Sequence, residues 1–153
     1  PLEMWGGRDP EYFQRIIDGQ SVEIPNTGET LLQIVHADDM ARSFVLALDR
    51  PGVTGDFNIS ASYAITLNRY VELLGDALGR APIIEHLPME DLWARYQDTG
   101  KVYRGGLLFL CEHMCFDLRK AREQLGYVPR YEPEESIPQT VKWMFEQGIL
   151  TRR

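Results

Sequence analysis

Apolar residues recur at helical spacing in six stretches of the chain, each bounded by residues that start or stop helices. The best defined begins after Thr66, a residue type that caps helix starts, and ends at Gly79, a residue type that ends helices. In the second stretch Asp38 or Asp39 is the expected cap, and in the last Pro138 is expected in the first turn. The pattern therefore predicts helices near residues 9–18, 38–50, 66–78, 88–96, 117–125 and 134–147.

Short apolar runs bounded by turn residues predict strands at residues 22–25, 31–35, 56–60 and 83–87. Residues 97–106 are polar and contain glycine, which predicts a mobile loop, whereas the segment after Gly106 fits either a helix or a strand. No repeat, low-complexity tract or flexible linker divides the chain. We therefore expect one mixed α/β unit over residues 1–153, with short strands and about five to six helices.

Composition narrows the class of protein. Of the 153 residues, 44% are hydrophobic and 25% charged, which is typical of a soluble globular domain. The formal net charge of −7 opposes binding to nucleic acid or to an anionic membrane, and no apolar run approaches the roughly 20 residues of a membrane-spanning helix. With only two cysteines, Cys111 and Cys115, the chain fits a reducing, cytoplasmic environment. Because the opening residues lack an initiator Met and a polar leader, we expect a fragment of a longer protein.

One motif indicates a family. The sequence Ile-Val-His-Ala-Asp-Asp-Met-Ala at residues 34–41 resembles the strand-to-helix signature of the NAD(P)-dependent epimerase/dehydratases, the extended short-chain dehydrogenase/reductases. The opening residues, the strand expected at residues 56–60, the helix from Thr66 to Gly79 and the segment after Phe116 match the same family in the same order. The resemblance implies that this chain is the C-terminal, substrate-binding part of such a protein.

The resemblance also implies what this part lacks. The family's Rossmann half carries a glycine-rich phosphate loop and a Tyr-x-x-x-Lys pair, and neither pattern occurs in this sequence. NAD or NADP is therefore expected in the parent protein and not on this fragment, which should be incapable of catalysis alone. A sugar or polyol-like molecule is the implied substrate, held between this part and the missing N-terminal Rossmann half. A non-catalytic protein-interaction module of the same ancestry is the alternative function.

By resemblance, the opening residues lie beside nicotinamide and substrate, and the segment near residue 100 covers the cleft. The implied substrate-binding residues are Leu2, Glu3, Met4, Trp5, Trp93, Tyr103 and Arg104. Nucleotide-sugar epimerases often place Asn where Glu3 stands and Arg where Leu32 stands, both contacting a diphosphate. A carboxylate near a diphosphate costs about 1 to 4 kcal/mol at roughly 4 Å. The presence of Glu3 and Leu32 at these positions therefore disfavours a nucleotide-sugar substrate. The alternative interpretation of Glu3 is a solvated surface carboxylate that binds no ligand.

Other polar residues have structural interpretations. By resemblance, His36 and Asp39 form the hinge of the strand-to-helix turn instead of a catalytic base and its orienting partner, and Asp117 caps a helix. The thiols of Cys111 and Cys115 with His113 place three potential ligands within five residues, too close together for a tetrahedral site, so we expect no metal.

The helix expected at residues 38–50 carries an apolar stripe that, in the parent architecture, packs on the Rossmann half. Without that half we expect the chain to self-associate or to leave Phe44, Val45 and Leu48 exposed.

Overall fold

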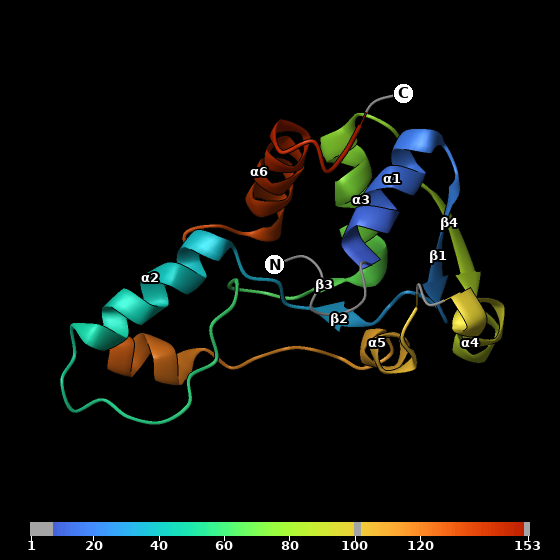
Figure 1. Cartoon of the computed structure of the whole chain (residues 1–153). Coiled ribbons are helices and arrows are strands. Elements are labelled where there is room, and N and C mark those ends of the chain that lie inside the picture. The colour runs from blue at the N-terminus through green and yellow to red at the C-terminus, as the bar shows by residue number, and fades with distance from the viewer. Residues whose placement is uncertain (1–7, 100–101, 152–153) are drawn as a thin grey trace.

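The structure of the chain is a computed structural model that describes residues 8–99 and 102–151. It contains six α-helices within these ranges (Figure 1). In chain order the elements are α1 (Arg8–Asp18), β1 (Ser21–Pro25), β2 (Leu31–Leu32), α2 (Ala37–Leu48), β3 (Ile65–Thr66), α3 (Leu67–Leu78), β4 (Ile83–Leu87), α4 (Met89–Tyr96), the 3₁₀ turn η1 (Gln97–Thr99), α5 (Arg104–Leu110), the π-helical turn η2 (Ala121–Leu125) and α6 (Pro133–Glu146). Within the described ranges, no helix combines the length and apolar character that a bilayer crossing requires.

Helices α1, α3 and α6 form the main body together with two small sheets (Figure 1). Strands β1 and β4 pair in parallel, with Val22 opposite Ile84, and β2 pairs antiparallel with β3. Residues on the inner faces of these elements exclude water together. The buried cluster comprises Tyr12, Phe13, Ile16, Val22, Ile24, Leu32, Ile65, Leu67, Tyr70, Val71, Leu73, Leu74, Leu110, Ile137, Val141, Met144 and Leu150.

Local capping chemistry sets the helix ends. The hydroxyl of Thr66 accepts a hydrogen bond from the Arg69 amide at 3.0 Å, and Gly79 ends α3 with a φ of 71°, as predicted. Helix α6 begins one residue before the expected range, because Glu132 and Glu135 form a reciprocal capping box. Pro138 therefore lies in the second turn and not in the first.

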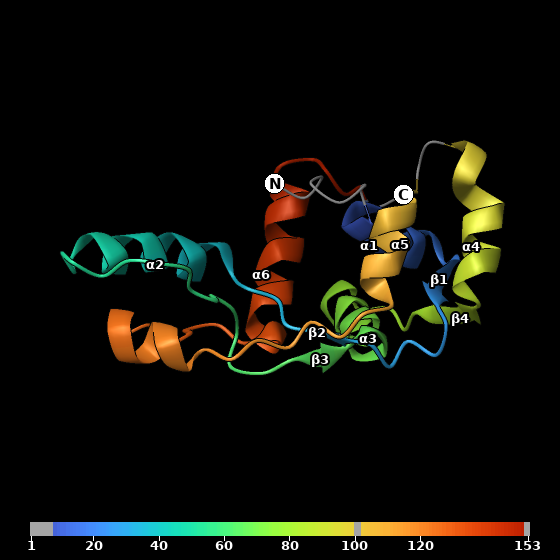
Figure 2. The ribbon, with the colours of Figure 1, turned by 90° about the horizontal axis from the view of Figure 1, so that it is seen from below.

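An arm projects from this body (Figure 2). It consists of α2, residues 53–59 and the segment around η2 (residues 116–128). It has a separate core of Leu118, Ala121, Leu125 and Tyr127. The Tyr127 hydroxyl donates to the Ser60 carbonyl at 2.9 Å, and Arg42 Nη1 donates to the Val128 carbonyl at 2.8 Å. Polar bonds thus join chain segments that are far apart in the sequence.

Two strand predictions are wrong, for one reason. Residues 56–60 form no strand, and of residues 31–35 only Leu31 and Leu32 pair with another strand. Side chains make several of the bonds that a neighbouring strand would have made, and one backbone bond joins the Ala61 amide to the Ile34 carbonyl at 2.9 Å. Gln33 Nε2 donates to the Ala61 carbonyl at 2.7 Å, and its Oε1 accepts from the Phe116 amide at 2.6 Å. An extended segment becomes a strand only where a partner backbone is present.

Two further predictions are corrected. Residues 97–106 are not wholly a loop, since η1 follows α4 directly and α5 begins at Arg104 and runs to Leu110. Neither Asp38 nor Asp39 caps α2. The cap is His36, whose Nδ1 accepts from the Asp38 amide at 3.2 Å.

Asp39 instead lies inside the first turn of α2 and joins the arm to the body. Its side chain is 1% exposed. Oδ2 accepts from the backbone amides of Arg130 and Tyr131 at 2.8 and 3.1 Å. Oδ1 has no hydrogen-bond donor among the described residues and lies 3.7 Å from Arg42 Nη1. The carboxylate therefore fixes the chain just before α6 against the start of α2.

Replacing Asp39 with Ala should lower the free energy of unfolding by about 3 kcal/mol, because two buried amides lose a charged acceptor. The exposed neighbour Asp38 provides the matched control, and Asp38→Ala should cost less than about 1 kcal/mol through the helix dipole alone. Urea denaturation measures both. Equal losses in the two variants would contradict the role given to Asp39.

Burial, followed by the charge of Asp39, raises the pKa of Tyr127 to about 12. An unfolded tyrosine ionises near pH 10. The folded state therefore favours the neutral phenol, and this contribution to stability is complete below about pH 10 and is lost as the pH rises towards 12. The stability difference between the wild type and Tyr127→Phe should shrink over that interval in denaturation curves. Parallel curves from pH 9 to 11 would show that the prediction is wrong.

Candidate functional site

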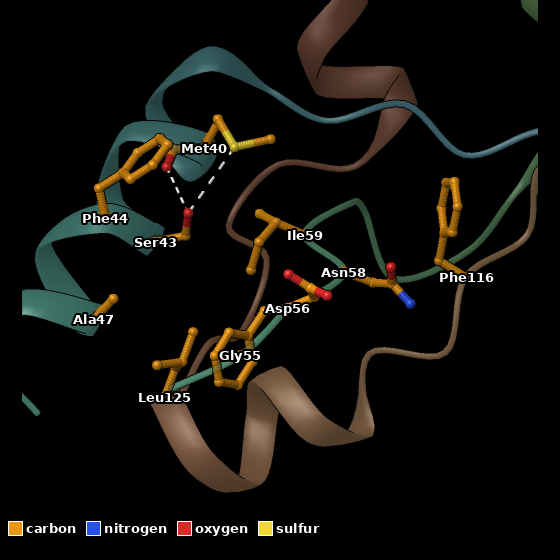
Figure 3. A pocket seen from close by; sticks show the side chains of 11 residues that line it. Met40, Ser43, Phe44, Ala47, Gly55, Asp56, Asn58, Ile59, Phe116 and Leu125 are labelled. Carbon is orange, nitrogen blue, oxygen red and sulfur yellow. Dashed lines mark hydrogen bonds between the residues drawn. The ribbon is translucent and has the colours of Figure 1, made fainter. Parts of the chain in front are cut away.

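A pocket of about 490 Å³ opens on the arm (Figure 3). Helix α2 contributes one wall and residues 55–59 another, and two residues of the segment around η2 complete it. The lining residues are Met40, Ser43, Phe44, Ala47, Gly55, Asp56, Phe57, Asn58, Ile59, Phe116 and Leu125. Sequence reasoning did not predict this pocket, although the alternation of Phe57 and Ile59 with polar residues in the expected strand was its signal.

The chemistry of the pocket is that of a packing surface. The hydroxyl of Ser43 donates to the Met40 carbonyl of its own helix at 2.7 Å. The side-chain amide of Asn58 donates to the Asp117 carbonyl at 3.3 Å. Lys120 Nζ lies 4.6 Å from the centre of the Phe57 ring and donates to the Asp56 carbonyl. Among the described lining residues no nucleophile contacts a base, so the pocket supports no acid–base step.

The exposed face of α2 extends this apolar surface. Phe44 is 65% exposed, Val45 55% and Leu48 82%, and Phe44 also lines the pocket. The exposure predicted from the sequence is thus confirmed. Contiguous exposed apolar groups in a soluble protein mark an interaction surface. We call α2 and this pocket the apolar docking face.

None of the described residues that were predicted to bind substrate lines this pocket. Leu2, Glu3, Met4 and Trp5 are outside the described residues. The other three lie on or beside α4 and α5, at the opposite end of the molecule from α2 (Figure 2). They are Trp93, Tyr103 and Arg104.

Helices α4 and α5 pack together and bring two of these residues onto neighbouring elements. Trp93 is half-buried on α4, and Arg104 Nη2 forms an ion pair with Glu90 Oε1 at 2.7 Å between the two helices. Tyr103 immediately precedes α5 and is 67% exposed. Aromatic rings and guanidinium groups are able to bind polar ligands, and none of these three residues lines the pocket on the arm.

The residues of the sequence signature make local structural contacts. Besides capping α2, His36 has its ring centre 4.1 Å from that of Tyr131. Asp117 Oδ1 accepts from the Arg119 amide at 2.9 Å, and bonds from Arg119 hold the pKa of that carboxyl below its usual value. The contacts of His36 join α2 to the segment before α6, and those of Asp117 are local to its own turn.

The cysteine-rich segment is engaged in packing. His113 Nδ1 accepts from the Leu31 amide at 3.1 Å, and the Cys111 thiol accepts from the Asn26 amide group at 3.3 Å. Burial raises the pKa of the Cys111 thiol, which disfavours the thiolate that binds metals. Within residues 8–99 and 102–151, no three His, Cys, Asp or Glu side chains are arranged to hold an ion.

The described residues do not fit a dinucleotide. Phosphate loops of that kind need glycines between a strand and the start of a helix. The positive-φ glycines here end helices, as Gly19 and Gly126 do, lie in the loop after α2, or turn between two strands, as Gly28 does. We therefore assign no NAD(P) contact to this part of the chain.

No family model matches the chain. A chloroplast stem-loop binding protein of 41 kDa from Arabidopsis thaliana is 25% identical over 99% of the chain and 37% of its own length. An uncharacterized protein of Methanocaldococcus jannaschii is 24% identical over 93% of the chain and 39% of its own length. The chain spans 34 to 50% of the curated relatives that it matches.

Among solved structures, UDP-glucose 4-epimerase of Thermotoga maritima superposes with a TM-score of 0.67 and 24% identity, covering 94% of this chain and 43% of that one. UDP-glucuronic acid 4-epimerase of Bacillus cereus gives 0.68 and 15%, covering 95% and 41%. The chain has the fold of the C-terminal part of these epimerases. The resemblance inferred from residues 34–41 and the mixed α/β class are confirmed.

The exposure of the apolar docking face predicts how it responds to mutation. Replacing Phe44 and Leu48 with Ser should change the free energy of unfolding by less than about 0.5 kcal/mol per site, because both are exposed already. It should also reduce binding of the dye ANS and any light scattering from self-association. Ile83→Ser, at a 58% exposed residue on β4, is the control and should leave dye binding unchanged. Strong destabilisation by the double substitution would mean that α2 packs internally.

Proposed function

We propose that the chain is the substrate-binding part of an NAD(P)-dependent sugar epimerase, dehydratase or reductase. The observation that carries this proposal is the superposition of 94% of the chain on the C-terminal part of a UDP-glucose 4-epimerase. In such an arrangement this part selects and covers the ligand, while the other half holds the nicotinamide. No catalytic step is assigned to the residues of this chain, which is expected to be inactive alone.

The nucleotide-binding half is proposed to dock on the apolar docking face. Two observations support this position. The face exposes Phe44, Val45 and Leu48 to solvent, and residues 56–60 beside it are extended without pairing with another strand. A sheet edge from the other half satisfies both, since it buries the apolar side chains and pairs those backbone groups of residues 56–60 that Lys120 and Tyr127 do not already bind. A second copy of this chain is the competing occupant.

The ligand is proposed to be a sugar, sugar acid or polyol that meets Trp93, Tyr103 and Arg104. An aromatic face and a guanidinium are groups that bind polyhydroxylated and anionic molecules. Where nucleotide-sugar epimerases often carry an arginine, Leu32 is 4% exposed within the core of the body. That position offers no charge to a diphosphate, which disfavours a nucleotide carrier on the sugar.

Two other functions are weighed against this one. A non-catalytic interaction module of the same fold would use the apolar docking face for a protein partner and bind no nicotinamide. RNA binding is the other function, and the Arabidopsis relative is named as a stem-loop binding protein. The net charge of −7 opposes it, because RNA binding is dominated by cations on the phosphate backbone.

Calorimetric titration of NAD and NADP separates the possibilities. The polypeptide encoded by the complete gene should bind one of them with saturation, and this chain alone should bind neither. Absence of saturable binding by the complete polypeptide would favour the interaction module. Retention of a stem-loop RNA that weakens steeply between roughly 50 and 200 mM salt would favour RNA binding.

Site variants locate the ligand. In the complete polypeptide, Arg104→Ala should weaken binding of the sugar ligand roughly tenfold, since a charged hydrogen bond is lost. Arg69→Ala removes an exposed arginine of α3 and should leave binding unchanged. Michaelis constants with UDP-glucose and with free sugars measure both effects. Equal effects of the two variants would place the ligand elsewhere.

A further inference from the structure

Helix α4 is attached to the body with little apolar packing. Leu92 is its one buried residue, and it belongs to neither of the two apolar cores. Helices that bury few apolar groups open with lower free energies than those in a core. The position of α4 must therefore depend on other contacts.

Those contacts begin on the outer face of β1. Side chains alternate along a strand, and Val22 and Ile24 are fully buried in the body core. Glu23 consequently points to the opposite face, where the parallel register places it next to Glu85 of β4. Two neighbouring carboxylates repel each other, so this face requires cations and donors from outside the sheet.

Helix α4 supplies them from its last turn. The Tyr96 hydroxyl donates to one carboxylate oxygen of Glu23, and Arg95 forms an ion pair with the other. Arg15 of α1 donates to the Tyr96 hydroxyl at 3.0 Å and to the Ser21 carbonyl at 3.0 Å. We call Glu23, Arg95, Tyr96 and Arg15 the α4 clasp. Figure 2 shows α4 beside β1, where the clasp joins them.

The burial of Glu23 distinguishes the clasp from the other ion pair of α4. The Glu23 side chain is 10% exposed, compared with 62% for Glu90, which pairs with Arg104 at the other end of α4. Hydrogen bonds to a desolvated charge are worth more than bonds in solvent. Burial, followed by the bond to Glu23, raises the pKa of Tyr96, which favours the protonated hydroxyl that donates to Glu23.

We propose that Glu23 is a positioning residue that clasps the last turn of α4 to β1, so that α4 opens from the sheet as a unit when the clasp is broken. Opening of α4 moves Trp93 and the Glu90 partner of Arg104 together, because both lie on this helix. The clasp thus controls the end of the molecule opposite the apolar docking face. The clasp requires no ligand, and its test does not depend on the proposed substrate.

Hydrogen–deuterium exchange of the whole chain, read by mass spectrometry, tests the clasp. Glu23→Gln keeps the shape of the side chain and removes its charge, and Tyr96→Phe removes only the hydroxyl. Each should accelerate exchange of the amides of residues 92–96 roughly tenfold, while amides of α3 and α6 keep their wild-type rates. The double variant should accelerate exchange by less than the product of the two single-variant factors, because both substitutions break one network.

The matched control lies on the same helix. Glu90→Gln removes an exposed ion pair of α4 and should change the exchange of residues 92–96 by less than about threefold. Three results would overturn the proposal: wild-type exchange of α4 in Glu23→Gln and in Tyr96→Phe, an equal effect of Glu90→Gln, or acceleration of every element together. The last result would mean that Glu23 supports the whole fold and does not govern α4 in particular.

Discussion

Every buried backbone amide and carbonyl needs a hydrogen-bond partner, and this requirement decides the form of the arm. Residues 56–60 have the alternation of a strand but no neighbouring strand among the described residues, so they remain extended without becoming one. Ser60 and Gln33 hold the base of this segment by side-chain bonds to backbone atoms. The pocket and the exposed face of α2 lie beside this segment.

The two ends of the molecule are held by different forces. The arm presents apolar side chains that the described residues leave exposed, which favours a partner of matching surface. At the other end, α4 depends on a buried carboxylate and its donors instead of on an apolar core. Apolar contact is tolerant in geometry, whereas hydrogen bonds to a charge are directional. The arm is thus suited to a permanent partner, and α4 to movement between defined positions.

Features governed by neighbouring residues were predictable from the sequence. The Thr66 cap, the Gly79 stop and the strands β1 and β4 depend on local chemistry and on alternation that is visible in the chain. Features governed by distant partners were not. The choice of His36 as the cap of α2 depends on Asp39 being engaged by Arg130 and Tyr131, about ninety residues later. The α4 clasp left no sequence signal either, because an outward Glu in a strand is ordinarily solvated.

The composition of the arm has a consequence for synthesis on the ribosome. Its small core joins α2 and residues 53–59 to residues 116–128, and contacts such as Arg42 with Val128 span 86 positions. During translation the N-terminal portion of the arm therefore waits, with its apolar residues uncovered, until the later segment has emerged from the exit tunnel. The apolar side chains of α2 and of residues 53–59 that later pack on Leu118 and Leu125 thus offer a binding site for chaperones during this interval.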